Sequence, residues 1–112
     1  MTKPPVLNEN KDFRRLYYRG KSRVHPALVT YVMKNRAGFC RVGITTSKKI
    51  GNAVQRNRAR RVIREAYRQL LPQIQGNYDF VFVARTKTVH QTAVQIQTVM
   101  AAHLIEMGLI AP

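Results

Sequence analysis

Apolar residues recur with a helical period in the middle of the chain, between residues 53 and 70. Six of them follow the spacing i, i+3, i+4, i+7, i+8 and i+11, which places them on one helix face: Ala59, Val62, Ile63, Ala66, Tyr67 and Leu70. Gly51 and Asn52 come just before and suit a tight turn and a helix N-cap. We predict a helix that starts after Asn52, buries this face, and ends before Pro72 or a residue or two beyond it.

Three segments have the pattern of β-strands. Residues 28–34 and 39–46 alternate apolar and polar positions around a turn at residues 35–38, which predicts an antiparallel hairpin. Residues 78–85 are almost continuously apolar and predict a strand covered on both sides. In the first strand of the predicted hairpin, one face carries Leu28, Thr30 and Val32 and the other carries Val29, Tyr31 and Met33. In the second strand, one face carries Cys40, Val42 and Ile44 and the other carries Phe39, Arg41, Gly43 and Thr45.

Two further helices complete the pattern. The first runs from Asn8 or Asn10 to residue 19, with Phe13, Leu16 and Tyr17 on one face and Gly20 as its stop. The last begins between residues 88 and 92, ends at Gly108, and carries the apolar stripe Ala93, Ile96, Met100, Leu104 and Met107. Residues 1–7 are predicted to be extended or flexible, and residues 21–24 to form a brief strand broken at residues 25–26. This order predicts a single α+β domain over residues 1–112, with helices packed on a mixed sheet.

The polar face of the central helix and the loop before it are strongly basic. Only Glu65 opposes the cations that crowd residues 47–70: Lys48, Lys49, Arg56, Arg58, Arg60, Arg61, Arg64 and Arg68. Like charges four residues apart on a helix repel by a few tenths of a kcal/mol per pair. The stripe is either a solvated basic face or a surface that a polyanion neutralises. The net charge of +15 and the pI of about 11.2 favour the second interpretation, with nucleic acid ahead of an anionic membrane.

The residues that metal and acid–base chemistry require are few and scattered. His25, His90 and His103 lack metal-ligand spacing, and five acidic residues form no obvious catalytic pair. We interpret His25 as a turn residue and His103 as a helix-surface or interface residue. Cys40 is the single cysteine, which excludes an internal disulfide, and we predict that it is a buried strand residue in a reducing cytoplasm. The sequence contains no apolar run that could span a membrane and no signal peptide.

Three aromatic residues allow two interpretations. Phe13 and Tyr17 are four residues apart on the first helix, and Tyr31 lies on a strand that could run beside it. They could pack as core between helix and sheet, or they could line a cleft in which the bases of single-stranded RNA stack. Residue spacing by itself leaves both interpretations open.

The basic segment resembles the RNR motif of the protein subunit of bacterial ribonuclease P. The matching positions are Lys48-Lys49-x-Gly51-x-Ala53-Val54-x-Arg56-Asn57-Arg58-x-Arg60-Arg61-x-x-Arg64-Glu65. The resemblance covers about residues 7–104, since Asp12-Phe13, Arg41-Val42-Gly43 and residues 79–85 also fit the family pattern. Tyr17 stands where phenylalanine is common in the family, and Arg60 stands where lysine is frequent.

This resemblance implies a fold and an activity. The family fold is a two-layer α-β sandwich of order αβββαβα, with a left-handed βαβ crossover against the usual right-handed rule. The family's enzyme is an endoribonuclease that removes the 5′ leader from precursor tRNA. Its active site and Mg²⁺ ions are in a catalytic RNA, so the resemblance implies a non-catalytic protein subunit to which no cofactor is assigned. The implied partners are that RNA and the precursor leader, in the cytoplasm, with neither membrane nor DNA.

The resemblance also implies which residues carry this function. Together with Arg68 on the same helix, the residues implied to bind the catalytic RNA are Lys48, Lys49, Asn52, Arg56, Asn57, Arg58, Arg60, Arg61 and Arg64. Phe13, Tyr17 and Tyr31 match the aromatic positions of the leader-binding cleft. The alternatives are an RNA-binding module of another ribonucleoprotein, a DNA-binding helix, and a protein-only nuclease.

Overall fold

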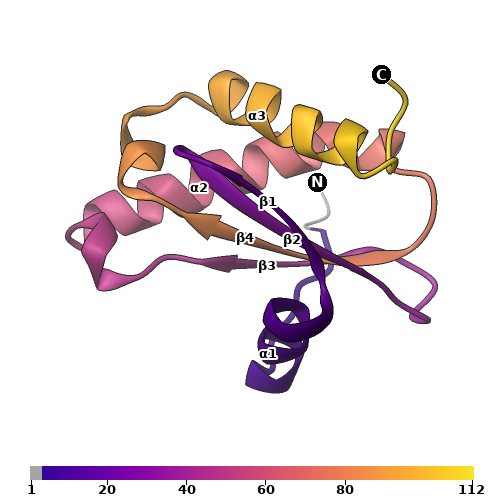
Figure 1. The fold of residues 1–112 in the computed structure, drawn as a ribbon. Coiled ribbons are helices and arrows are strands. Elements are labelled where there is room, and N and C mark those ends of the chain that lie inside the picture. The colour runs from indigo at the N-terminus through magenta and orange to yellow at the C-terminus, as the bar shows by residue number, and fades with distance from the viewer. Residues whose placement is uncertain (1–3) are drawn as a thin grey trace.

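The computed structural model describes residues 4–112 and has the predicted element order αβββαβα (Figure 1). Its helices and strands are α1 (Asn10–Arg19), β1 (Lys21–His25), β2 (Leu28–Lys34), β3 (Arg41–Thr45), α2 (Ala53–Leu70), β4 (Tyr78–Ala84) and α3 (Ala93–Glu106). Most boundaries agree with the sequence prediction to within two residues. Short 3-10 turns that the periodicity did not predict are η1 (Lys48–Ile50), η2 (Leu71–Gln73) and η3 (Thr86–His90).

The strands form one mixed sheet in the order β1-β2-β4-β3. The predicted hairpin between residues 28–34 and 39–46 is therefore wrong, because β4 lies between β2 and β3. Alternation identified both strands but could not identify their partners. β4, which is the strand most buried on both faces, lies in the interior of the sheet between them. The hairpin of this sheet joins β1 to β2, which pair from Lys21↔Val32 to His25↔Leu28.

β3 and β4 are parallel neighbours, and the chain passes from one to the other through α2. This is the crossover position that the family resemblance implied. Part of the other edge of β3 is covered by the N-terminal segment, where Val6 forms a parallel bridge to Val42. The first three residues of the predicted extended segment lie outside the described residues. Cys40, predicted to be a buried strand residue, instead precedes β3 and is half-buried, with its thiol 3.4 Å from the carbonyl oxygen of Gly76.

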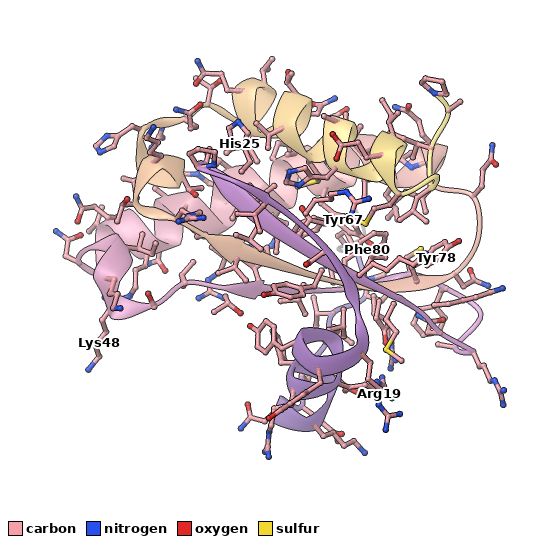
Figure 2. The ribbon with its side chains drawn as sticks, in the orientation of Figure 1. Arg19, His25, Lys48, Tyr67, Tyr78 and Phe80 are labelled. Atoms are coloured by element: carbon pink, nitrogen blue, oxygen red, sulfur yellow. The ribbon has the colours of Figure 1, made fainter. Side chains whose placement is uncertain are left out.

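The main core lies between the sheet and the layer formed by α2 and α3 (Figure 1). All six residues of the predicted face of α2 are buried, and the Tyr67 ring packs against Phe80 and Phe82 at centroid distances of 5.6 and 5.7 Å (Figure 2). Each large side chain buried in this way contributes about 1.5–3 kcal/mol. Their sum far exceeds the repulsion among the cations on the opposite face of α2, which is why the basic helix stays folded on the sheet.

His103 on α3 is buried, which corrects the prediction of a helix-surface or interface residue. Its Nδ1 lies 2.8 Å from the Thr30 hydroxyl on β2. His103 is seven residues from Ile96 and three from Met100, so it lies on the predicted apolar stripe, and its imidazole is buried there with Thr30 as a hydrogen-bond partner. Burial lowers the pKa of His103, and the charged or titratable groups around it are Glu106, His25 and Arg23. His25 was predicted to be a turn residue, but it is the last residue of β1, and its Nδ1 accepts from the Ala27 amide in the turn that follows.

In the described part of the chain, α1 is the one helix on the opposite face of the sheet (Figure 1). A smaller cluster holds this helix, with Leu7, Leu16 and Val81 buried and Phe13, Tyr31, Met33 and Val83 packed around them. Gly20 ends α1 at a point where a Cβ atom would lie 2.5 Å from the Leu16 carbonyl oxygen. Because this apolar cluster is small, a polar interaction also contributes to fixing the position of α1 on the sheet.

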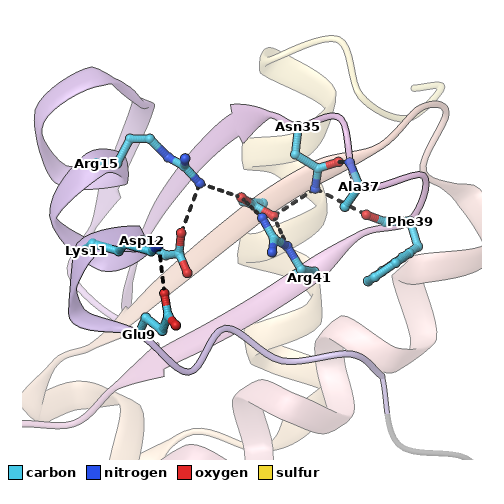
Figure 3. Close-up of polar contacts among 9 residues, drawn as sticks. Glu9, Lys11, Asp12, Arg15, Asn35, Ala37, Phe39 and Arg41 are labelled. Carbon is cyan, nitrogen blue, oxygen red and sulfur yellow. Dashed lines mark hydrogen bonds and ion pairs between the residues drawn. The ribbon is translucent and has the colours of Figure 1, made fainter.

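That polar interaction is centred on the carboxylate of Asp79, which is 1% exposed at the start of β4. Figure 3 shows the side chains of Arg15, Asn35 and Arg41 converging on it. Arg41 on β3 donates to both carboxylate oxygens at 2.8 Å, and Asn35 donates to Oδ1 at 2.7 Å. Arg15 on α1 donates to Asp79 Oδ2 at 3.3 Å and to Asp12 Oδ1 at 3.1 Å. The hydrogen bonds to Asp79 raise the pKa of Arg41. One carboxylate thus connects α1, the segment after β2, β3 and β4.

We predict that Arg41→Leu lowers the free energy of unfolding by about 3 kcal/mol, measured by urea denaturation. The substitution leaves a buried carboxylate without its two-point partner, and breaking a buried pair from one side costs about 3–5 kcal/mol. Arg61→Leu is the control, because this exposed arginine has no such partner among residues 4–112 and should change stability by about 0.5 kcal/mol or less. Equal losses in the two variants would contradict the assigned role of Asp79.

We also predict that stability falls as the pH drops below about 6.5, the ordinary pKa of histidine. The unfolded chain protonates His103 at its ordinary pKa, whereas in the folded chain burial lowers the pKa, so protons favour the unfolded state in this window. Urea denaturation at about pH 7.5 and pH 5.5 should show a smaller decrease for His103→Gln than for the wild type. The exposed His90→Gln control should behave like the wild type. Identical pH dependence in all three proteins would contradict the prediction.

Candidate nucleic-acid interface

The loop before α2 has a defined conformation. Asn52 is the N-cap as predicted, because its side chain accepts from the Gln55 amide at 2.9 Å and the Gln55 side chain accepts from the Asn52 amide at 2.9 Å. This reciprocal pair is a capping box. Gly51 has φ +142°, a backbone conformation that favours glycine. The Asn52 side chain, which the sequence predicted to bind RNA, therefore already accepts a hydrogen bond as the N-cap of α2.

Three arginines of α2 hydrogen-bond to neighbouring segments of the protein. Arg56 donates to the Gly51 carbonyl at 2.7 Å. Arg58 donates to the carbonyls of Val89 at 3.0 Å and Gln91 at 3.4 Å, which connects α2 to the segment before α3. Arg60 donates to the Ile44 carbonyl at 3.2 Å and to the Thr46 hydroxyl at 2.6 Å, at the end of β3. Each is half-buried, so part of its hydrogen-bonding capacity supports the fold.

A second group of predicted residues is exposed and unengaged. Within residues 4–112, no side-chain hydrogen bond or ion pair is formed by Lys48, Lys49, Asn57, Arg61 or Arg64. Lys48 projects away from the protein on the loop before α2 (Figure 2). We call these five residues the open basic surface. Their four charges meet no compensating acid there, so a polyanion could approach them directly.

Arg68 differs from this group because an acid neutralises it. Its guanidinium donates to Glu65 Oε1 at 2.7 Å and Oε2 at 3.1 Å, and Gln69 donates to the same carboxylate at 3.0 Å. The hydrogen bonds from Arg68 and Gln69 lower the pKa of Glu65 to about 2. The pair therefore stays ionised at physiological pH, and Arg68 offers less net charge to an RNA than Arg61 or Arg64.

Phe13 extends from α1 onto the backbone of β3. A Cβ atom at Gly43 would lie 2.5 Å from Phe13 Cζ, so the ring reaches this position only because residue 43 is glycine. Arg60 and Arg64 of α2 line the same small hollow at the edge of β3. The predicted aromatic surface and the predicted basic surface are therefore continuous here. Alternation in the sequence predicts that Gly43 lies on the face opposite Val42, but it gives Gly43 no part in the site.

Tyr17 and Tyr31 extend this aromatic surface along the sheet. Their rings are 5.0 Å apart at an interplanar angle of 77°, and the Tyr17 hydroxyl lies 2.8 Å from the Thr45 hydroxyl. Tyr17 is 40% exposed, and Phe13 and Tyr31 are half-buried. The rings therefore pack between α1 and the sheet, as the core interpretation predicted, and because they also leave area exposed, stacking on RNA bases stays a prediction. We call the surface formed by Phe13, Tyr17, Tyr31 and Thr45 the aromatic cleft, after the leader-binding cleft that the family resemblance implies.

The acidic residues nearest the site serve as ion-pair partners. Asp12 and Asp79 both accept from Arg15, and Asp79 also accepts from Arg41. Across residues 4–112, no three histidine, cysteine or acidic side chains gather where they could hold a metal ion. Over the same residues, none of the helices is both long and apolar enough to cross a lipid bilayer.

Comparisons with known proteins identify the family of this chain. The sequence profile of the family described as Ribonuclease P matches residues 1–108. A ribonuclease P protein component of Clostridioides difficile (strain 630) is 46% identical over 87 residues, which cover 77% of this chain and 76% of that protein. Another, of Clostridium novyi (strain NT), is 43% identical over 111 residues, which cover 97% of this chain and 98% of that protein. The structure of the RNase P protein of Staphylococcus aureus superposes with a TM-score of 0.82 at 33% identity, and the match covers 94% of this chain and 96% of that one. The chain therefore belongs to the ribonuclease P protein family.

Proposed function

We propose that this protein binds a catalytic RNA through the open basic surface and the 5′ leader of precursor tRNA through the aromatic cleft. In this proposal it assists the hydrolysis that releases the leader, in the cytoplasm, while the RNA partner holds the active site and its Mg²⁺. The observation that carries the proposal is the hollow at the edge of β3, where Phe13 meets Arg60 and Arg64. One binding surface for phosphates thereby adjoins another for bases.

Electrostatics supports contact between the open basic surface and a structured RNA. The protein has a net charge of +15, and the four cations of this surface have no acidic partner of their own within residues 4–112. Phosphates neutralised by such cations release condensed counterions, which favours binding and makes it depend on salt. The neighbouring Arg56, Arg58 and Arg60 stiffen this surface through their bonds to backbone carbonyls.

The aromatic cleft suits a single strand better than a duplex. Half-buried rings such as Phe13 and Tyr31 can stack only on bases that are already unpaired, as in a leader. Stacking is worth about 1–3 kcal/mol per base and tolerates different sequences, which a protein needs if the leaders of different precursors vary. Mature tRNA lacks the leader and so lacks these contacts. Contact with the cleft would therefore favour precursor over product.

The carboxylates near the site support a role for the polypeptide in binding and positioning. Asp12 and Asp79 are held by Arg15 and Arg41, and Asp79 is buried, so neither is presented to an RNA phosphate. The chemistry that the proposal requires is metal-assisted attack on one phosphodiester. We assign the Mg²⁺ for that step to the catalytic RNA, and we assign binding and orientation of the leader to this chain.

The test of this function is reconstitution with a catalytic ribonuclease P RNA at low Mg²⁺. We predict that the protein raises the rate of precursor cleavage and the affinity for precursor but not for mature tRNA. Phe13→Ala should reduce precursor affinity by about fivefold or more, the equivalent of one lost stacking contact. Gly43→Val, which retains the ring but forces it away from β3, should have an effect in the same direction.

Two results would contradict the proposal. One is cleavage by the RNA-free protein, which would indicate a protein-only nuclease. The other is RNA binding that leaves the cleavage of precursor unchanged, which would indicate an RNA-binding module of another ribonucleoprotein. Phe39→Ala serves as the matched control, because Phe39 is 48% exposed in the segment between β2 and β3 and belongs to neither surface.

We further predict that the arginines of α2 separate into two classes by measurement. Arg61→Ala with Arg64→Ala should preserve stability and weaken binding to the catalytic RNA, and should reduce the slope of log affinity against log salt by about 2. Arg58→Ala removes two hydrogen bonds to carbonyls, so the free energy of unfolding should fall by about 1.5–3 kcal/mol. Filter binding over a salt series and urea denaturation provide the two readouts. An unchanged salt slope in the double variant would remove Arg61 and Arg64 from the interface.

A further inference from the structure

The outward face of α1 carries a stripe that neither of the two surfaces includes. Its members lie at positions i, i+3, i+4, i+7 and i+8 of the helix, which share one face: Lys11, Arg14, Arg15, Tyr18 and Arg19. Tyr18 lies near the middle of this face, with cations on both sides. Phe13, Leu16 and Tyr17 occupy the opposite face, toward the sheet. We call this set the outer α1 stripe.

Tyr18 is the unusual member of the stripe because it is 88% exposed. Within residues 4–112 its side chain has neither a ring contact nor a hydrogen bond, whereas Tyr17 beside it has both. A tyrosine that contributes to the core or to a cap would be covered on at least one side. The Tyr18 ring instead offers both faces to a partner, with the positive charges of Arg14 and Arg19 nearby.

The cations of the stripe are available for phosphates. Arg14 and Arg19 form no ion pair or side-chain hydrogen bond within residues 4–112, and Arg19 projects from the end of α1 (Figure 2). Lys11 pairs with Glu9 at 3.1 Å, but both side chains are more than half exposed, so this pair is weak and exchangeable. Arg15 is bonded to Asp12 and Asp79, which holds the stripe in a fixed orientation on the sheet.

The position of α1 connects this stripe to the aromatic cleft. In the described chain α1 is the only helix on its face of the sheet, so no other helix covers its outward face (Figure 1). Tyr17 in the cleft and Tyr18 on the stripe are adjacent residues. A strand that leaves the cleft therefore has to cross only the width of one helix, about 10 Å, to reach Tyr18.

From this geometry we infer that the outer α1 stripe binds single-stranded RNA, namely the part of a precursor leader that lies beyond the cleft. The inference rests on the proposed function and extends it to longer leaders. An exposed aromatic ring flanked by arginines is the arrangement that stacks bases while tracking phosphates. Duplex phosphates would use the cations but leave the ring without a role. A membrane is a poorer fit, because the stripe has one aromatic residue and no aliphatic one.

The experiment compares two precursors in the enzyme reconstituted with catalytic RNA. One has a leader just long enough to fill the cleft, and the other has a leader about twice as long. The wild-type protein should bind the long-leader precursor several-fold more tightly. Tyr18→Ala should weaken binding of the long-leader precursor by about fivefold and leave the short-leader precursor unchanged. Tyr18→Phe, which retains the ring, should behave like the wild type.

Further variants test the charges and the specificity of the effect. Arg14→Gln with Arg19→Gln should reduce the salt slope by about 1 to 1.5 for the long leader only, since single strands contribute about 0.7 per phosphate contact. Phe39→Ala, which removes an exposed aromatic ring elsewhere, should leave both precursors unaffected. Photo-crosslinking from a distal leader nucleotide should map to residues 14–19 in the wild type. Since the replaced side chains are exposed, the thermal unfolding midpoint of each variant should match that of the wild type.

The outcomes separate this inference from the proposed function. Tyr18→Ala that weakens both precursors equally, or neither, overturns the inference, as does a distal crosslink that maps away from α1. In either case Phe13→Ala would still weaken both precursors, and the cleft would stand. If the wild-type protein does not discriminate any precursor from mature tRNA and Phe13→Ala has no effect, both the proposed function and this inference fail.

Discussion

The carboxylate of Asp79 holds together the parts of the protein that the site requires. It is almost completely buried, and three hydrogen-bonding side chains reach it: Arg41 from β3, Arg15 from α1, and Asn35 from the segment after β2. A buried ion pair of this kind adds little stability over a well-packed apolar cluster, but it is intolerant of misplacement. It therefore specifies where α1 lies on the sheet. The aromatic cleft and the outer α1 stripe both depend on that placement.

Arginine has two uses in this protein, and the same helix contains both. Arg56, Arg58 and Arg60 donate to backbone carbonyls and extend the contacts of α2 to neighbouring loops. Arg61 and Arg64 project into solvent without partners within residues 4–112. The planar guanidinium suits both tasks, because its five donors can satisfy carbonyls or phosphates. A strongly basic helix can thus be stable in the folded protein without RNA and still present unneutralised charge to an RNA.

The sequence-based predictions were accurate where local geometry decides the outcome. The spacing of Ala59 through Leu70 predicted the buried face of α2, and Asn52 was correctly identified as its N-cap. The alternation of residues 28–34 predicted β2 and the two sides on which its residues pack. The RNR-type motif indicated the family, which the comparisons then showed. In these cases the signal is a periodicity or a spacing within about twenty residues, which the backbone converts directly into structure.

The sequence by itself determined the element order, the core face of the basic helix, the positive charge and the family. Only the tertiary structure decided that β4 separates β2 from β3, that His103 is buried against Thr30, and which arginines remain open. It also brought Gly43 under Phe13, which makes the two binding surfaces continuous. The physical reason is the distance along the chain over which each signal acts. Periodicity reports how a segment exposes its own faces, whereas strand partners and side-chain partners are chosen by contacts between segments far apart in the chain.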